Sequence, residues 1–215
     1  MNHVILQPAG NKGTRSHYAD TIEKPVGLGL IRKHISSDLY EKLSSLYPHG
    51  VVPVWGVTPG EKDVNKKKWQ RILTGDVTLF AREGAIVSSA VVTEKTSCES
   101  LAVELWRRDE KGQTWEYIYF LDEVQSVRIP YADFNKIAGY APGNVIQGFN
   151  VLDEAKSLKI LEHFDLESGI HFPDISESEY QQAVASLIGG GPLDVTTQTK
   201  SRAEQGFLRK FLFGI

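Results

Sequence analysis

The segment 115–121 constrains the fold most, because its side chains alternate strictly between two faces and neither face is polar throughout. One face carries three aromatic side chains before Leu121, and the other combines an acidic, an aliphatic and an aromatic side chain. The two faces hold, in this order, Trp115, Tyr117 and Tyr119, and Glu116, Ile118 and Phe120. One face of such a strand must pack in the core, and the other either lies under a helix or lines a pocket.

Shorter segments around this strand carry the patterns of further strands and helices. Strands are predicted at 51–57, 76–80, 85–93, 124–129 and 144–152. Helices are predicted at 37–46, 64–73 and 131–137. Glu83-Gly84 marks a hairpin turn between the second and third of these strands. The pattern predicts an α/β (α+β) fold, in which helices flank a sheet.

The residue pattern changes after Leu152, beyond which no further strand is predicted. We predict a domain at 1–152 with its core at 51–152, a helical extension at 153–188, and a linker at 189–200 that begins with three glycines and a proline. The last segment, 201–215, has an apolar helical face that usually packs on something. We therefore expect it to lead into a domain that this chain does not include.

The length of 215 residues suits one main domain with a small appendage. No apolar stretch is long enough to span a bilayer, and no secretory signal precedes the first predicted element. The single cysteine, Cys98, has no partner for an internal disulfide. These features predict a cytoplasmic protein with no membrane partner.

Catalytic motifs are missing from the sequence. The six histidines are dispersed, with no HExxH pair and no cysteine cluster that could complete a metal site. Neither a GxSxG elbow nor a phosphate-binding GxxxxGK[ST] loop occurs. We therefore expect this chain to bind rather than catalyse, and to need no cofactor. An enzyme acting on a nucleotide or nucleic acid remains the alternative from a different class.

Basic residues crowd into one predicted helix although the net charge of the chain is −3. Such a run is most often a solvated face. Here it lies near the aromatic residues of the predicted sheet. Lysines that contact phosphates beside aromatic rings that stack on a base are the combination that nucleic-acid recognition requires.

Several motifs together resemble the EVE-like domains of the PUA superfamily. They are Trp55-Gly56-Val57, Asn65, Trp69, the segment from Gly75 to Phe80, the segment from Leu101 to Trp106, the segment from Gly112 to Tyr119, and Gln147-Gly148-Phe149. More narrowly, the chain resembles the amino-terminal sensor of EVE–HNH modification-dependent restriction endonucleases. The likeness covers roughly Pro53 to Leu152, and 202–212 resembles the helix that leads into the HNH module.

The resemblance implies a strongly curved, barrel-like sheet with a pocket for a base flipped from double-stranded DNA. The base would be 5-methylcytosine or 5-hydroxymethylcytosine, as in type IV-like restriction. Cleavage, with its divalent metal, would belong to the absent HNH domain, and the full-length parent could form a homodimer. An RNA-binding PUA-like module is the runner-up, because related pockets take methylated adenine in RNA.

Two sets of residues are predicted to form the site. The base pocket comprises Trp55, Asn65, Trp69, Asp76, Tyr117 and Phe120. The phosphate-binding residues are Lys62, Lys66, Lys67, Lys68 and Arg71. Asp76 has a second interpretation: after Gly75 and before a strand, it can be a turn residue that binds backbone amides.

Overall fold

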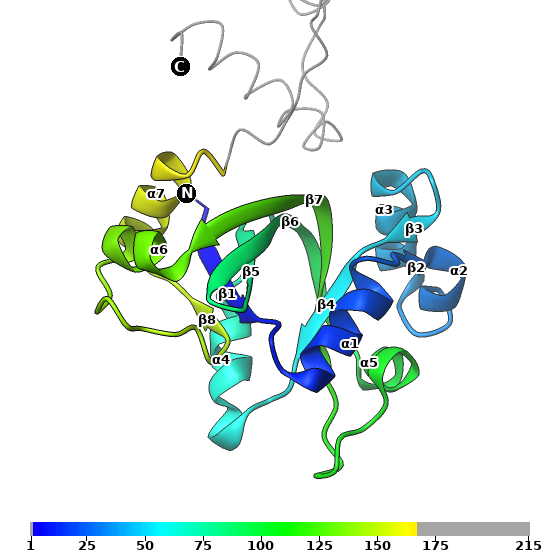
Figure 1. Ribbon diagram of the computed structural model, residues 1–215. Helices are drawn as coiled ribbons and strands as arrows, with labels where there is room; N and C mark the ends of the chain where they lie inside the picture. Colours follow the sequence, from blue (N-terminus) through cyan, green and yellow to red (C-terminus); the bar gives the residue numbers. More distant parts are fainter. Residues whose placement is uncertain (1, 167–215) are drawn as a thin grey trace, which may run out of the picture. The chain divides into compact units, whose positions relative to one another are not determined.

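The structure is a computed structural model, and it describes residues 2–166 (Figure 1). Its strands are β1 (Val4–Pro8), β2 (Val26–Gly27), β3 (Val51–Val52), β4 (Val54–Val57), β5 (Val77–Arg82), β6 (Ala85–Ser97), β7 (Tyr117–Pro130) and β8 (Asn150–Val151). Its helices are α1 (Lys12–Thr21), α2 (Leu28–Ile31), α3 (Ser37–Leu46), the 3-10 helix η1 (Glu61–Asp63), α4 (Val64–Gln70), α5 (Glu99–Trp106), α6 (Tyr131–Ala138) and α7 (Glu154–His163).

Six strands form one sheet in the order β4-β7-β6-β5-β1-β8, and β2 pairs with β3 separately. Neighbouring strands of the large sheet are antiparallel except β1 and β5, which are parallel. The long β6–β7 hairpin shifts its register at three places, between Ile86 and Ser88, between Ser89 and Val91, and between Val92 and Glu94. Such irregularities bend and twist a sheet, and the two strands arch visibly over the others (Figure 1). The sheet is therefore a strongly curled half-barrel.

The inner face of the half-barrel is lined by one buried group of side chains, here called the inner cluster. It draws on all six strands of the sheet, on α1 and on the α4 region. Its members are Ile5, Ala9, Tyr18, Ile22, Trp55, Val57, Trp69, Ile72, Phe80, Ala90, Val92, Tyr117, Tyr119, Leu121, Phe149 and Val151. A cluster that all strands share is the one that a curled sheet encloses.

The outer face is covered at its two ends by different helices (Figure 1). Around β4 and β7, side chains from α2, α3 and α5 pack with Ile118 and Phe120. Around β1 and β5, side chains from α6 and α7 pack with Leu6 and Leu79. The alternation predicted for 115–121 is confirmed from Tyr117 onward, since odd positions face inward and even positions outward.

The structure agrees with the sequence analysis on the helices at 37–46 and 131–137 and on the hairpin, and it differs at both ends of the sheet. The strand predicted at 51–57 divides at Pro53, so that β3 pairs with β2 and β4 with β7. The strand predicted at 144–152 is reduced to Asn150–Val151, because the segment before it forms no ladder.

The buried core extends beyond 51–152 in both directions. Strand β1, which was not predicted from the sequence, lies between β5 and β8. Helix α7 follows, and its Ser157 hydroxyl accepts a hydrogen bond of 2.9 Å from the backbone N–H of Val4. The part of the predicted helical extension after residue 166, the linker at 189–200 and the segment 201–215 lie outside the described residues. None of the helices in 2–166 is long and apolar enough to cross a membrane.

Candidate functional site

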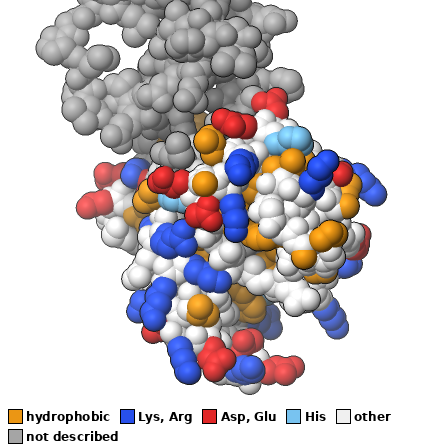
Figure 2. Space-filling view, turned by 90° about the vertical axis from the view of Figure 1, so that its left-hand side faces the viewer, with side chains coloured by type: hydrophobic (Ala, Val, Ile, Leu, Met, Phe, Trp, Pro, Cys, Tyr) orange, Lys and Arg blue, Asp and Glu red, His pale blue; other side chains and the backbone are white. Residues whose placement is uncertain are grey.

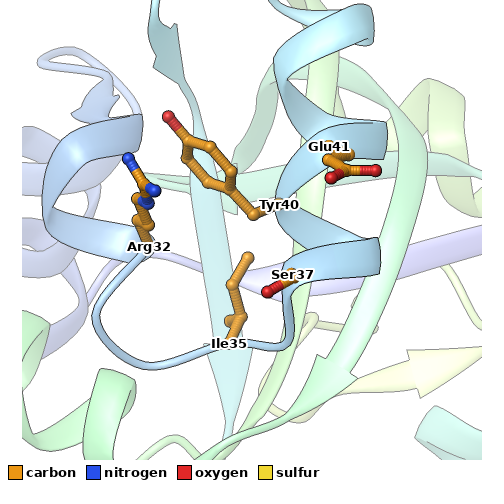
Figure 3. Close-up of a pocket in the computed structure, with 5 residues that line it drawn as sticks. All are labelled: Arg32, Ile35, Ser37, Tyr40 and Glu41. Atoms are coloured by element: carbon orange, nitrogen blue, oxygen red, sulfur yellow. The ribbon is translucent and has the colours of Figure 1, made fainter.

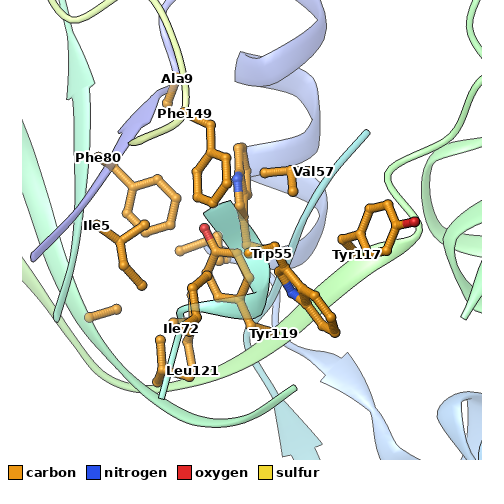
Figure 4. Close-up of a cluster of buried hydrophobic side chains, with 14 of the residues drawn as sticks. Ile5, Ala9, Trp55, Val57, Ile72, Phe80, Tyr117, Tyr119, Leu121 and Phe149 are labelled. Atoms are coloured by element: carbon orange, nitrogen blue, oxygen red, sulfur yellow. The ribbon is translucent and has the colours of Figure 1, made fainter. Parts of the chain in front are cut away.

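The inner cluster places several aromatic rings against one another (Figure 4). Trp55 of β4 is directly opposite Tyr119 of β7 in the ladder, and its ring meets that of Phe80 edge-on at 5.1 Å between centroids. Trp69 reaches in from α4 and lies 5.2 Å from Tyr117. Rings from three strands and one helix thus gather in the hollow of the half-barrel. These rings are buried against one another, so a planar base could stack on them only if a neighbouring side chain moved aside.

Helix α4 forms part of the cover over these rings, and two contacts fix its C-terminal end. The indole N–H of Trp69 donates to the carbonyl of Ile118 at 3.2 Å. Lys95 of β6 places its ammonium 4.7 Å from the Trp69 ring centre and donates to the carbonyls of Trp69, Gln70 and Ile72. A cation at this end of a helix is favourable. Burial lowers the pKa of Lys95, and Asp76 partly offsets this.

The segment that leads into β8 forms another part of the cover. Phe149 is buried in the inner cluster, and its ring lies between those of Phe80 and Trp55 in Figure 4. The ammonium of Lys68 donates to its carbonyl at 2.9 Å. Arg71 donates similarly to the carbonyl of Leu152 at 3.3 Å. Two of the predicted phosphate-binding residues therefore tie α4 to the chain around β8.

The remaining predicted phosphate-binding residues point to the outside of α4. Lys62 and Lys67 are exposed and line a hollow of about 460 Å³ together with Glu61 and Val64. Lys66 is half-buried. Basic side chains gather on the lower half of the face in Figure 2, with acidic ones between them. The basic surface therefore also contains acidic side chains, and it adjoins α4, the helix that carries Trp69.

The structure brings three of the six predicted pocket residues together. Trp55, Trp69 and Tyr117 all belong to the inner cluster. Phe120 does not, because it packs in the outer group on the opposite face of the sheet. Tyr117 and Phe120 are three positions apart on one strand, so they cannot line the same face.

The other two predicted pocket residues have local roles in the structure. Asn65 is half-buried at the start of α4, where a side chain at Gly60 (φ 74°) would come within 2.9 Å of its amide group. Asp76 is buried and accepts hydrogen bonds from the backbone N–H groups of His3 (2.7 Å) and Leu73 (2.8 Å). The contacts of Asp76 are those of the turn interpretation rather than of a residue facing the inner cluster.

Three residues of the inner face were missed by the sequence analysis as site residues: Gln7, Thr78 and Phe149. Gln7 is two residues from Ile5 on β1, and Thr78 is two residues from Phe80 on β5. Residues two apart on a strand point to the same face, so Gln7 and Thr78 face inward with Ile5 and Phe80. Both are buried. Thr78 could have been noticed as a polar residue within an otherwise apolar predicted strand. Gln7 could not, because its strand was not predicted from the sequence.

A second hollow lies on the outer side of the sheet, between the end of α2 and the start of α3 (Figure 3). It measures about 210 Å³ and is lined by Arg32, Ile35, Ser37, Tyr40 and Glu41. The Arg32 guanidinium lies 5.1 Å from the centre of the Tyr40 ring. The position of this hollow separates it from the inner cluster. Within residues 2–166, no three His, Cys, Asp or Glu side chains gather closely enough to hold a metal ion.

Comparison with known proteins identifies the fold. No protein-family model matches the chain, and a comparison with curated proteins finds no relative. Among solved structures, the chain is similar to the N-terminal domain of Thermococcus gammatolerans McrB, which is bound to m5C DNA. The TM-score is 0.57 at 15% identity, over 77% of this chain and 98% of that domain. The predicted fold class, an α/β fold with a strongly curved sheet flanked by helices, is thereby confirmed.

Proposed function

We propose that this chain binds DNA that contains a modified cytosine and holds the modified base, flipped out of the duplex, against the inner cluster. The observation that carries the proposal is the gathering of Trp55, Trp69 and Tyr117 in the hollow of the half-barrel, beside a lysine-rich helix. The similarity in fold to a domain bound to m5C DNA supports the same ligand class.

The energetics are consistent with this assignment. Extruding a base costs a few kcal/mol, and stacking on an aromatic ring returns about 1–3 kcal/mol per base. Lysines that neutralise phosphates add attraction that does not depend on sequence. Lys62 of η1 and Lys67 of α4 can do so because both are exposed. Affinity would thus come from the helix, and preference for the modified base from the rings.

The sequence resemblance supports a finer proposal, in which the chain acts as the sensor of an HNH modification-dependent endonuclease. The segment 202–212 carries this part of the likeness. Cutting, and any divalent metal, would then belong to a partner domain. The choice between 5-methylcytosine and 5-hydroxymethylcytosine, which differ by one oxygen, is left to measurement.

The test is equilibrium binding by fluorescence anisotropy to duplexes of one sequence that differ at a single cytosine: unmodified, 5-methylated or 5-hydroxymethylated. Single-stranded RNA with and without N6-methyladenine serves as competitor. We expect tighter binding to one or both modified duplexes and weak competition by RNA. Equal affinity for all three duplexes would contradict the proposal, and stronger binding to methylated RNA would favour the RNA-binding alternative.

A further inference from the structure

Polar atoms without partners lie on the inner face of the half-barrel. Four buried side-chain atoms there have no hydrogen bond of ordinary geometry: Gln7 Oε1, Trp55 Nε1, Thr78 Oγ1 and Tyr119 Oη. Each of the four residues is at most 3% exposed. A buried polar group without a partner costs about 1–3 kcal/mol, so four of them on one face need a reason.

These atoms come from four strands that the curl of the sheet brings together. The Tyr119 hydroxyl points into the middle of the inner cluster, toward the rings of Phe80, Phe149 and Trp55 (Figure 4). Burial raises the pKa of Tyr119 well above its usual range, and its neighbours Thr78 and Gln7 partly offset this. The phenol reaches Thr78 of β5 from β7, across the intervening strand β6, where Ala90 is the small residue paired with Thr78.

The chemistry of the four groups suits the edge of a pyrimidine that carries an amino group. Cytosine presents one donor, its 4-amino group, and two acceptors, N3 and O2. The indole N–H of Trp55 is a donor only, and the Tyr119 and Thr78 hydroxyls can each donate. Gln7 Oε1 supplies an acceptor. The group can therefore satisfy all three positions of the cytosine edge, which an aromatic wall alone cannot do.

Access to these atoms depends on Phe149. Among the aromatic residues of the inner cluster, Phe149 alone comes from a segment outside any helix or strand. The carbonyl of Phe149 is held by Lys68 of the basic helix. A base could therefore reach the four atoms if this ring moved aside.

We propose that Gln7, Thr78 and Tyr119, together with the indole N–H of Trp55, form the specificity-determining set that reads the hydrogen-bonding edge of the extruded base behind Phe149. This inference rests on the proposed function and adds to it the residues that choose the base. The aromatic rings can stack on any base, whereas the polar set forms hydrogen bonds only with a base whose donors and acceptors match it.

Tyr119→Phe tests the proposal, because it removes one unpaired hydroxyl and keeps the ring. The melting temperature should change little, since the contacts of the hydroxyl with Thr78 and Gln7 fall short of ordinary hydrogen-bond geometry. Affinity for the 5-methylcytosine duplex should fall about tenfold, the effect of one buried hydrogen bond. Affinity for the unmodified duplex should stay the same, because under the proposed function that duplex is bound through its phosphates and its cytosine, which has the same edge, stays stacked. Thr78→Val, which replaces the second hydroxyl with a methyl group of similar size, should act in the same direction.

Tyr47→Phe is the matched control. The Tyr47 hydroxyl lies on the outer face of the sheet, where it bonds to Thr93 Oγ1 at 2.6 Å and to the carbonyl of Leu121 at 2.9 Å. Removing it should lower the melting temperature and leave the ratio of the two affinities unchanged. A purely structural role for Tyr119 would give the control's result in both variants.

The outcomes separate the two claims. A fall in the affinity ratio for Tyr119→Phe or Thr78→Val, without loss of stability, supports the reading set. An unchanged ratio in both variants overturns it and leaves the proposed function standing, provided that the wild type prefers the modified duplex. If the wild type shows no preference, the proposed function itself has failed, and this is seen before any variant is compared.

Discussion

Tyr47 and Tyr119 lie on opposite faces of one sheet, and their hydroxyls show how differently the two faces are built. The outer hydroxyl has two partners, whereas the inner one has none of ordinary geometry. The inner face holds four of the eight unpaired buried side-chain atoms of the described residues, and the other four are scattered. The outer face is therefore built mainly for stability, and the inner face gives up some stability for polar groups that a ligand could satisfy.

The largest effect should come from Phe120→Ala, which empties a fully buried site on the outer face. We expect a loss of about 3–5 kcal/mol in the free energy of unfolding, because a phenyl ring leaves a cavity. The folded fraction should keep its preference for modified DNA. Chemical denaturation combined with anisotropy binding measures both quantities. Loss of that preference in folded protein would place Phe120 in the recognition site after all.

Asp76→Ala should be next in size. Its carboxylate accepts hydrogen bonds from two backbone N–H groups, which would remain buried without an acceptor. We expect unfolding to become easier by about 2–4 kcal/mol, with no change in the ratio of affinities for modified and unmodified duplex. Thermal unfolding and binding on one preparation decide between the two interpretations of Asp76. A stable variant that no longer discriminates would assign it to the base.

The paired change Lys62→Ala and Lys67→Ala tests the basic surface separately from the inner face. Both side chains are exposed and make no contact with the loop at Phe149, unlike Lys68. Affinity should fall equally for modified and unmodified duplex, and the slope of log affinity against log salt should flatten by about one unit per lost phosphate contact. An unchanged slope would show that these lysines are ordinary solvated surface residues that contact no phosphate.

The smallest effect should come from Lys95→Met, which keeps the aliphatic stem under Trp69 and removes the donor to three carbonyls. A loss of about 1 kcal/mol in unfolding free energy is expected, from weaker capping of α4. Hydrogen exchange should speed up in α4 and stay unchanged in α3. Equal exchange in α4 of the variant and the wild type would show that the contacts of Trp69, Lys68 and Arg71 fix the helix without Lys95.

Local pattern was enough to predict the parts of this fold that local contacts build. The β5–β6 hairpin closes through a turn at Glu83-Gly84, and α3 begins after Ser36, whose hydroxyl accepts from the Leu39 N–H. The inward facing of Tyr117 and Tyr119 follows from the two-residue period of a strand. Tyr117 could be chosen for the same reason, whereas Trp55 and Trp69 were chosen as aromatic residues of the motifs that carry the family resemblance.

The rest depends on pairings between distant parts of the chain. His3 donates to Asp76, 73 residues away, and Gln7 comes opposite Phe80 only through the β1–β5 ladder. A five-residue strand at the amino terminus carries too short a pattern to reveal such a partner. Phe120 was assigned to the pocket on residue type, although its parity places it on the outer face.

The most direct test of the account follows the four tryptophan indole N–H signals by NMR as methylated duplex is added. Trp55 and Trp106 are both buried with unpaired N–H groups, but they lie on the inner and outer faces respectively. Single Trp→Phe variants assign the signals. The account predicts that the Trp55 signal moves downfield at saturation with 5-methylcytosine duplex, does not move with unmodified duplex, and that Trp106 stays in place. An unmoved Trp55 signal at saturation would contradict binding of the base on the inner face.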